Sequence, residues 1–274
     1  MKLGLYGGGF KPFHAGHFSK LQLALDQNDK VFLLFGIKKT KYSKRTGKLS
    51  STWWKHQRSF DRENTQDSRR YAQEMQEAIF KIYEEELENL YPEKLEVMDV
   101  SGTPIGSINR VLDAYATMSL TGNVMPLEIS GQTWSGIILN DLDEINVYAG
   151  PDEIATQYVG QMRKRAEKEN PVGQKLIELI DEGVITFTPE YHPDTPDELT
   201  QIRGTDVRDF VATGDEEGLR RNLPNLTGDP VEDNRIKDKI IDILKTDFIP
   251  PDVDPDWEIT ESLLRDYIRE ILRG

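Results

Sequence analysis

Two histidines three positions apart, His14 and His17, lie in a short segment whose residue types suit the binding of a phosphate group. The segment runs Gly8-Gly9-Phe10-Lys11-Pro12-Phe13-His14-Ala15-Gly16-His17. Consecutive glycines let a ligand approach the backbone closely, because no Cβ stands in the way. Both imidazoles should fall near the first turn of a following helix, where unpaired N–H groups and the helix dipole favour an anion. The segment therefore indicates a site for a nucleoside triphosphate.

The segment follows a short apolar run, Leu3-Gly4-Leu5-Tyr6, which predicts a buried strand. A strand that passes through glycines into a helix is a typical nucleotide-binding arrangement. The alternative is a glycine-rich turn that contains two incidental histidines. Only four histidines occur in the chain, and two of them lie in this segment, which favours the functional interpretation.

The pattern Gly-x-Phe-x-Pro-x-His-x-Gly-His resembles the signature of the HIGH-type nucleotidyltransferases, and every position of it is filled. The resemblance implies an α/β fold, Rossmann-like, with a parallel sheet. It also implies transfer of a nucleotidyl group from a nucleoside triphosphate with release of pyrophosphate. It assigns the phosphates to His14 and His17, with Lys11 as an added cation. The other motif residues expected beside the nucleotide are Gly8, Gly9, Phe10 and Gly16.

A second segment, Ile202-Arg203-Gly204-Thr205-Asp206-Val207-Arg208, is similar to the Ile-Ser-x-Thr-x-Ile/Val-Arg motif of the same family. Thr205 is expected to cap a helix that begins at Asp206, so that its hydroxyl and the adjacent amides face a phosphate. Arg208 adds a forked cation one turn later. The sequence departs from the family at Arg203, where Ser is usual, and a guanidinium replaces the hydroxyl. The resemblance assigns the triphosphate to Arg203, Gly204, Thr205 and Arg208.

A further contribution is expected after the strand at residues 144–149. In the family a Gly-x-Asp segment at the end of this strand lies by the nucleotide, so the resemblance places Gly150 and Asp152 on the adenosine or ribose side. The alternative is an ordinary turn from strand to helix, with Asp152 near the N-cap. The sequence leaves both open.

The net charge of −14 repels anionic substrates, so any attraction must be local. Residues 38–58 contain Lys and Arg but no Asp or Glu. They follow a second predicted strand at residues 31–36, and loops at the carboxyl ends of such strands line the ligand crevice. The alternative is a solvated basic loop with its tryptophans in the core. The candidate substrate-binding residues are Lys44, Arg45, Lys48, Trp53 and Trp54.

Composition and length fit a soluble enzyme. The 274-residue chain has no cysteine, which excludes disulfides and thiolate zinc sites and suits a reducing cytoplasm. Its longest apolar runs are too short to span a bilayer, and we expect no membrane and no nucleic acid partner. No metal ligands are assigned in the chain, because Mg²⁺ would be held mainly by the nucleotide phosphates and water.

The domain boundaries are predicted from changes in composition and periodicity. Residues 1–248 should form the nucleotidyltransferase domain, with an insertion or irregular region at about 101–140. Helices are predicted at 68–90, 106–119, 153–168 and 171–182, and strands at 95–100 and 184–188. A Pro- and Asp-rich linker follows at 249–258, and then an amphipathic helix at 259–274. That helix would pack on its own chain, form a homo-oligomer or dock on a partner.

The Phe-x-Pro-Phe-His version of the first motif is closer to nicotinamide-nucleotide adenylyltransferases than to cytidylyltransferases, which usually show Phe-Asp in place of Phe10-Lys11. The resemblance therefore favours ATP and nicotinamide mononucleotide as substrates, giving NAD. One alternative is a cytidylyltransferase that uses CTP and a phosphorylated alcohol. Another is a non-catalytic assembly protein that retains this fold and works through its C-terminal helix.

Overall fold

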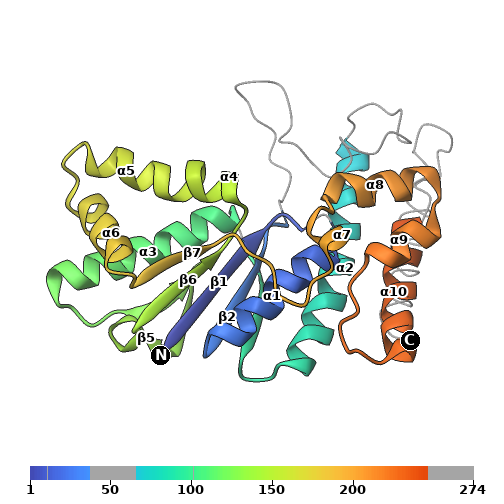
Figure 1. The fold of residues 1–274 in the computed structure, drawn as a ribbon, viewed down its shortest axis with the longest axis horizontal. Coiled ribbons are helices and arrows are strands. Elements are labelled where there is room, and N and C mark those ends of the chain that lie inside the picture. Colours follow the sequence, from blue (N-terminus) through green and yellow to red (C-terminus); the bar gives the residue numbers. More distant parts are fainter. Residues whose placement is uncertain (11, 38–65, 101, 246–274) are drawn as a thin grey trace. The chain divides into compact units, whose positions relative to one another are not determined.

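The computed structural model describes residues 1–10, 12–37, 66–100 and 102–245 (Figure 1). The chain divides into two compact units. The sheet unit comprises Met1–Gly9, Ser19–Gly36 and Tyr91–Thr195. The helical unit comprises Phe10–Phe18, Ile37–Leu90 and Pro196–Gly274. The first motif thus contributes residues to both units.

A five-stranded parallel sheet forms the centre of the sheet unit, in the order β3-β2-β1-β6-β7. Counted along the chain within this sheet, the order is 3-2-1-4-5, the doubly wound arrangement of Rossmann-like folds. The predicted α/β fold with a parallel sheet is therefore confirmed. The strands are β1 (Lys2–Gly8), β2 (Lys30–Phe35), β3 (Leu95–Asp99), β6 (Glu144–Tyr148) and β7 (Ile185–Thr188).

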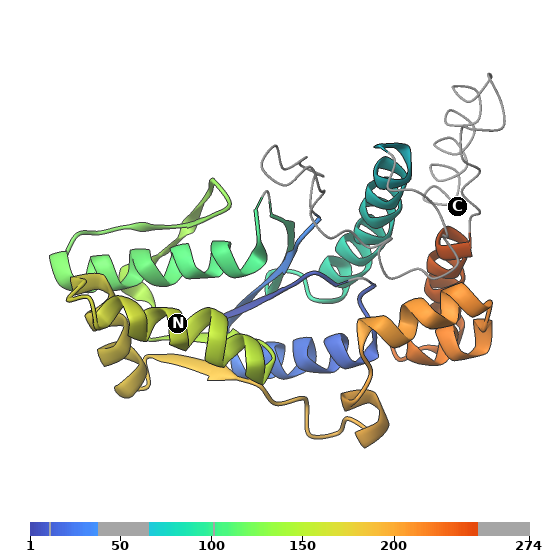
Figure 2. The same cartoon turned by 90° about the horizontal axis from the view of Figure 1, so that it is seen from above.

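Helices cover both faces of this sheet, and two glycines of β1 show how closely they approach. A Cβ on Gly4 would lie 2.9 Å from the side-chain nitrogen of Asn28, directly after α1 (Ala15–Gln27). A Cβ on Gly7 would lie 2.8 Å from Pro104 in α3 (Pro104–Thr121). Side chains alternate along a strand, so α1 and α3 lie on opposite faces, as Figure 2 shows. Burial on both sides explains the unbroken apolar sequence of β2.

The region at about 101–140, expected to be an insertion or irregular, contains an antiparallel hairpin of β4 (Pro126–Ile129) and β5 (Gln132–Ile138) after α3. Its turn residues Ser130 and Gly131 both have positive φ, 53° and 83°, as a tight two-residue hairpin turn requires. The Trp134 ring meets Phe32 of β2 edge-on, with ring centroids 5.0 Å apart. The hairpin is therefore part of the core on the α3 face.

After β6 the chain forms α4 (Pro151–Glu153), a π-helical turn η3 (Ile154–Val159) and α5 (Gly160–Ala166). The predicted helix at 153–168 is therefore present, but it contains an irregularity. Gly160 is needed there, because a Cβ would lie 2.4 Å from the Ala155 carbonyl oxygen. The next helix is α6 (Pro171–Asp181), which packs on α3 and α5.

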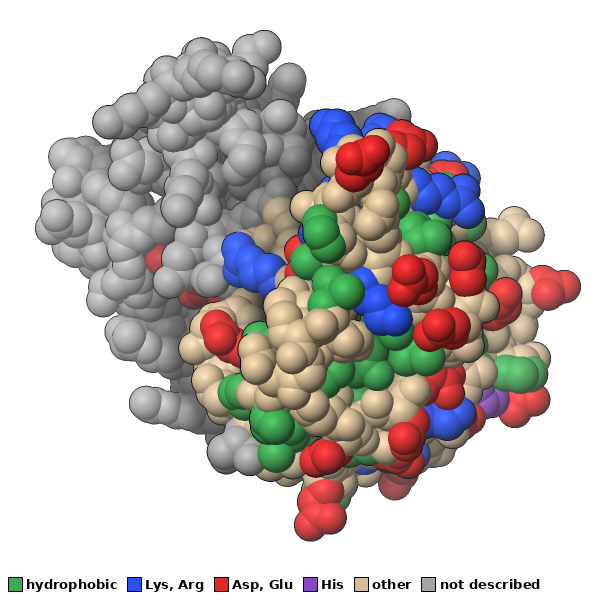
Figure 3. Space-filling view, turned by 90° about the vertical axis from the view of Figure 1, so that its left-hand side faces the viewer, with side chains coloured by type: hydrophobic (Ala, Val, Ile, Leu, Met, Phe, Trp, Pro, Cys, Tyr) green, Lys and Arg blue, Asp and Glu red, His purple; other side chains and the backbone are tan. Residues whose placement is uncertain are grey.

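Charged side chains of both signs are interspersed with apolar ones on the face drawn in Figure 3. The negative net charge is therefore not gathered into one acidic patch on that face. Among the described residues, every helix is too short or too polar to cross a membrane.

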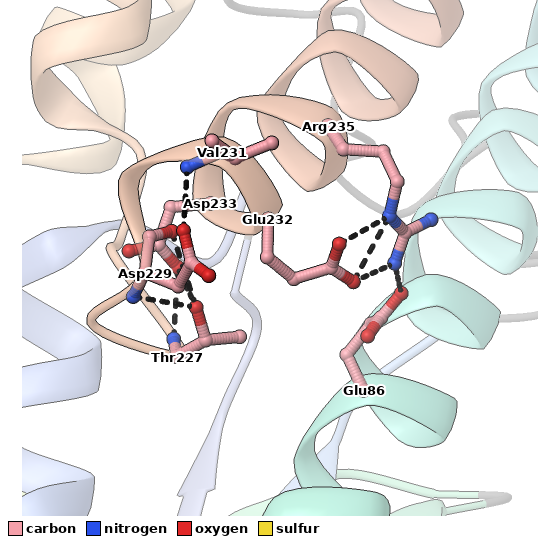
Figure 4. A network of polar contacts seen from close by, with 7 residues as sticks. All are labelled: Glu86, Thr227, Asp229, Val231, Glu232, Asp233 and Arg235. Carbon is pink, nitrogen blue, oxygen red and sulfur yellow. Dashed lines mark hydrogen bonds and ion pairs between the residues drawn. The ribbon is translucent and has the colours of Figure 1, made fainter.

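The helical unit packs α10 against α2 and α9, and α8 against α9. Arg235 of α10 donates to Glu86 of α2 at 2.6 Å and also contacts Glu232 one turn earlier (Figure 4). This ion pair links two helices that are far apart in the sequence. The helices are α2 (Gln66–Leu90), α7 (Asp197–Thr200), α8 (Gly204–Thr213), α9 (Glu216–Asn222) and α10 (Pro230–Lys245).

A buried carboxylate, Asp233, organises the turn before α10 (Figure 4). Its Oδ1 accepts from the Thr227 main-chain N–H at 2.8 Å and from the Thr227 hydroxyl at 3.0 Å. Its Oδ2 accepts from the Gly228 N–H at 3.2 Å. Asp229 then caps the helix, because its Oδ1 accepts from the Val231 N–H at 2.8 Å. One aspartate therefore fixes the turn and a second fixes the helix start.

We expect Asp233→Ala to lower the free energy of unfolding by about 2–3 kcal/mol, because three donors lose a charged acceptor in a buried place. Urea unfolding followed by circular dichroism measures this change. Glu217→Ala is the matched control, since that carboxylate is 88 % exposed and forms a surface ion pair with Arg221. It should stay within about 0.5 kcal/mol of the wild type. Equal losses in both variants would contradict the role given to Asp233.

Candidate functional site

The two histidines of the first motif stack on each other at the start of α1. Their ring centroids lie 3.6 Å apart with an angle of 30° between the planes. The main-chain N–H of His14 donates to Nδ1 of His17 at 3.2 Å. Because this Nδ1 accepts, a neutral His17 ring carries its proton on Nε2. The helix start therefore fixes both the orientation and the tautomer of His17.

His14 is buried, with 4 % of its surface exposed. Burial lowers its pKa to about 4, and the Asp206 carboxylate opposes this shift only in part. The ring is therefore neutral at pH 7. Its Nδ1 has no hydrogen-bond partner among the described residues, and buried polar atoms are rarely left unpaired. This atom is a candidate ligand contact that would act through a hydrogen bond and not through charge.

Aromatic side chains pack against the pair of His14 and His17. Phe13 stacks on His17, with centroids 5.6 Å apart, and Phe10 meets the same ring edge-on at 5.0 Å. Tyr83 of α2 donates its hydroxyl to the Phe13 carbonyl oxygen at 2.8 Å. Tyr83 is fully buried, and burial raises its pKa far above the ordinary value, so the hydroxyl keeps its proton. The Tyr83 hydroxyl thus fixes the residue before His14.

Tyr83 was not among the predicted site residues. In the sequence it belongs to the apolar stripe of the helix at 68–90, which predicts only core packing. The one available signal was a hydroxyl on an otherwise apolar helix face, and buried tyrosine hydroxyls usually find a partner.

Gly16 is required by close packing. A Cβ there would lie 2.7 Å from the Leu199 carbonyl oxygen of α7 and 3.3 Å from the His14 ring. No other residue fits without displacing one of these neighbours. The predicted contact between Gly16 and a nucleotide stays a prediction.

The second motif begins α8, but not as expected. The helix starts at Gly204 with Arg203 at its N-cap, so Thr205 is the second helical residue. The prediction of Thr205 as the N-cap is therefore wrong. The physical reason is Asp206, whose Oδ2 accepts from the Arg203 N–H at 2.8 Å and so fixes the helix start two residues earlier than predicted.

The helical unit contains both histidines and the whole second motif. The two motifs lie close enough for the negative charge of Asp206 to raise the pKa of His14, against the larger effect of burial. The Arg203 side chain makes no capping hydrogen bond to the first turn of α8. The residues expected at the triphosphate that belong to this unit are Phe10, His14, Gly16, His17, Arg203, Gly204, Thr205 and Arg208.

In the sheet unit, the carboxyl ends of β1 and β6 lie side by side. The strand order changes direction between these two strands, and ligands of doubly wound sheets bind outside the carboxyl ends at this point. Gly8 ends β1, and Gly150 follows β6 as the N-cap of α4. Asp152 is exposed in the first turn of α4. Gly8, Gly9, Gly150 and Asp152 thus occupy the expected place, while their contact with a nucleotide stays a prediction.

Several predicted residues lie outside the described part of the chain. They are Lys11, Lys44, Arg45, Lys48, Trp53 and Trp54, together with residues 249–274, where a linker and a helix are predicted. The side chains of Thr205 and Arg208 also lie outside the description, although their backbone belongs to α8. In the part that is described, no three His, Asp or Glu side chains gather as a metal site would require.

The strand order and the helices on both faces define a doubly wound α/β protein. No family model matches this chain, and no curated protein does. Among solved structures, the chain is similar to a bifunctional NMN adenylyltransferase/ADP ribose pyrophosphatase from Francisella tularensis, with a TM-score of 0.36 and 11 % identity. The match covers all of this chain and 56 % of that one, so this chain spans about half the length of that enzyme. A similarity of this size does not establish a shared activity.

We expect the His14 ring to titrate near pH 4 in the folded protein, which NMR of ¹⁵N-histidine-labelled protein measures. In the unfolded chain the ring binds its proton below pH 6.5, while the folded state does not until about pH 4. Stability should therefore fall across this window as the pH is lowered, by up to about 3 kcal/mol from His14 alone. His14→Gln should remove that part of the pH dependence. Titration near pH 6.5 would contradict the burial of the ring.

Proposed function

We propose that this chain is a nucleotidyltransferase, which transfers a nucleotidyl group from a nucleoside triphosphate to a phosphorylated acceptor and releases pyrophosphate. The observation that carries the proposal is the stacked pair of His14 and His17 in one unit with the start of α8. His14 has a buried nitrogen without a partner among the described residues. His17 has a fixed tautomer. The neutral His14 ring is suited to form a hydrogen bond at a bound phosphate without a change of charge, and Nε2 of His17 is suited to donate.

The second motif supplies the other phosphate contacts in this proposal. The first-turn N–H groups of α8 at Gly204 and Thr205 point out of the helix end, as in any α-helix, and they favour an anion. Arg208 and Lys11 add positive charge, and Arg203 would add a third cation. Because the net charge of the chain is −14, these local donors must hold the triphosphate against a repulsive background.

The reaction needs no protein base. A phosphate monoester of the acceptor is largely dianionic near neutral pH, because its second pKa is about 6. One of its oxygens attacks the α-phosphorus, the bond from that phosphorus to the bridging oxygen breaks, and pyrophosphate leaves with the electron pair. His14, His17 and the α8 amides would stabilise the charge that develops on the phosphate oxygens. Mg²⁺ would enter with the triphosphate as its complex.

We propose ATP as the nucleotide and nicotinamide mononucleotide as the acceptor, which gives NAD. The support is the Phe10-Lys11-Pro12-Phe13-His14 version of the motif. In this proposal Gly150 and Asp152 contact the nucleoside. The basic segment with Lys44, Arg45, Lys48, Trp53 and Trp54 would contact the acceptor.

Pyrophosphate release by the purified protein tests this proposal. ATP and CTP are each supplied with Mg²⁺ and a panel of phosphorylated acceptors that includes nicotinamide mononucleotide. We expect release with ATP and nicotinamide mononucleotide, and NAD as the second product by mass spectrometry. Release with CTP alone would make the chain a cytidylyltransferase. No release with any pair would contradict the enzymatic proposal and favour an assembly role.

His17→Ala should lower kcat/KM by about 10²–10³, the usual loss when a donor to a developing charge is removed. His17→Asn is the matched variant, because its amide keeps N–H donors on a shorter side chain and should retain more activity. Thermal unfolding of both variants is the control, since their midpoints must stay close to that of the wild type for the comparison to report on chemistry. Unchanged turnover in His17→Ala would contradict the assignment.

A further inference from the structure

A buried lysine on α1, Lys20, belongs to neither motif. It lies in the sheet unit with 4 % of its surface exposed. Its Nζ donates to the carbonyl oxygens of Ala149 at 2.9 Å and Pro189 at 2.6 Å. The same ammonium lies 4.7 Å from the centroid of the Tyr191 ring, within range of a cation–π contact. Buried lysines are rare, and this one is held by three separate contacts.

The two carbonyl groups lie at the carboxyl end of the sheet, directly after two neighbouring strands. Ala149 directly follows β6 and directly precedes Gly150, the N-cap of α4. Pro189 directly follows β7, the strand that pairs with β6. One ammonium group therefore connects the carboxyl ends of both strands. The bond to Ala149 is buried and the bond to Pro189 is part-buried, so loss of the ammonium would leave a buried carbonyl oxygen at the end of β6 without this donor, which is costly. The Ala149 N–H also donates to the Thr188 carbonyl oxygen at 3.3 Å.

Other residues of α1 hold the same loop after β7. The Ser19 hydroxyl accepts from the His192 N–H at 3.1 Å and is also hydrogen-bonded to the Thr195 hydroxyl. Asp26 contacts the His192 ring, with 3.0 Å between Oδ2 and Nε2. Lys20 differs from these neighbours because it alone among them also contacts the end of β6.

The charge of Lys20 is set by its surroundings. Burial lowers its pKa to about 8, while the carboxylates of Glu190 in the loop and Glu153 in α4 oppose this shift. Tyr191 is the phenol beside this ammonium. At pH 7 the amine is therefore mostly charged, and charged donors make the stronger hydrogen bonds to carbonyl oxygens.

We propose that Lys20 is a positioning residue for nucleotide binding, which fixes residues 149–153 by holding the carbonyl groups at the ends of β6 and β7. This inference rests on the proposed function, which assigns Gly150 and Asp152 to the nucleoside. A loop that is already ordered binds more tightly, because its ordering entropy is not lost on binding. Lys20 acts through the backbone and does not itself touch the substrate.

Two variants of equal side-chain length separate the hydrogen bonds from packing. Lys20→Met removes every donor, whereas Lys20→Gln keeps an amide with two N–H donors and no charge. Lys175→Met is the control, because that ammonium pairs with Glu178 one turn later in the same helix, α6, at 3.1 Å. All three are compared with the wild type as the full chain.

Amide hydrogen exchange should become about tenfold faster in Lys20→Met at residues 150, 152 and 153 and at 190–192, where the two carbonyl anchors are lost. The KM for ATP should rise about tenfold with kcat within about twofold, because ground-state binding is affected and the chemical step is not. Lys20→Gln should recover part of both changes, and Lys175→Met should show neither.

The exchange measurement does not require activity, so the two proposals fail separately. A wild type that transfers no nucleotidyl group refutes the proposed function, and ATP binding by calorimetry then replaces KM. Unchanged exchange in Lys20→Met overturns the role of Lys20. Faster exchange with unchanged KM and unchanged ATP affinity also overturns it, since Lys20 would then be only structural. If Lys20→Met does not fold, Lys20→Gln against the wild type decides by the same criteria.

Discussion

The pairing of β1 with both β2 and β6 is the constraint on which the sheet unit depends. β1 is the central strand. From β1 the chain adds β2 and β3 on one side and then β6 and β7 on the other. This pairing forces Gly8 and Gly150 to one edge of the sheet, although 142 positions separate them in the sequence. It also requires helices on both faces, which is why Gly4 meets Asn28 directly after α1 while Gly7 of the same strand meets Pro104 of α3. The apolar strands and the small residues of β1 follow from that double burial.

The sequence predicts the individual helices and strands, but it does not predict hydrogen bonds between residues that are far apart along the chain. An unbroken apolar run identifies β2, and a helical period identifies α2, because each depends on neighbouring residues. Thr205 was misplaced because Asp206 competes for the helix start through a side-chain bond that composition does not reveal. Lys20 was missed because its acceptors are 129 and 169 positions away. Tyr83 was missed because its acceptor is 70 positions away. In both cases only the fold shows that a polar group has found a partner.

Burial acts on His14 and Lys20 in the same direction but leaves them in different states at pH 7. Each pKa falls, to about 4 and to about 8 respectively, because a buried charge loses its hydration. His14 becomes neutral since its ordinary value already lies close to 7. Lys20 stays mostly charged since its ordinary value is far higher. Lys20 is also satisfied by two carbonyl oxygens, whereas Nδ1 of His14 has no partner among the described residues. Lys20 is therefore suited to support the backbone, and His14 is suited to bind a ligand.

The helices of the two motifs begin in a similar way, and this bears on how an acidic chain could hold a phosphate. At the start of α1 the His14 N–H donates to the ring of His17, and at the start of α8 the Arg203 N–H donates to Asp206. In each case the side chain at the third helical position satisfies the N–H of the N-cap residue. Arg203 places no side-chain acceptor on the first-turn amides of α8, and those amides carry the positive end of the helix dipole. Main-chain donors do not change with pH and add nothing to the net charge. Binding that relies on them and on a neutral His14 would weaken with added salt less than binding through lysines alone, because salt screens the attraction of exposed full charges.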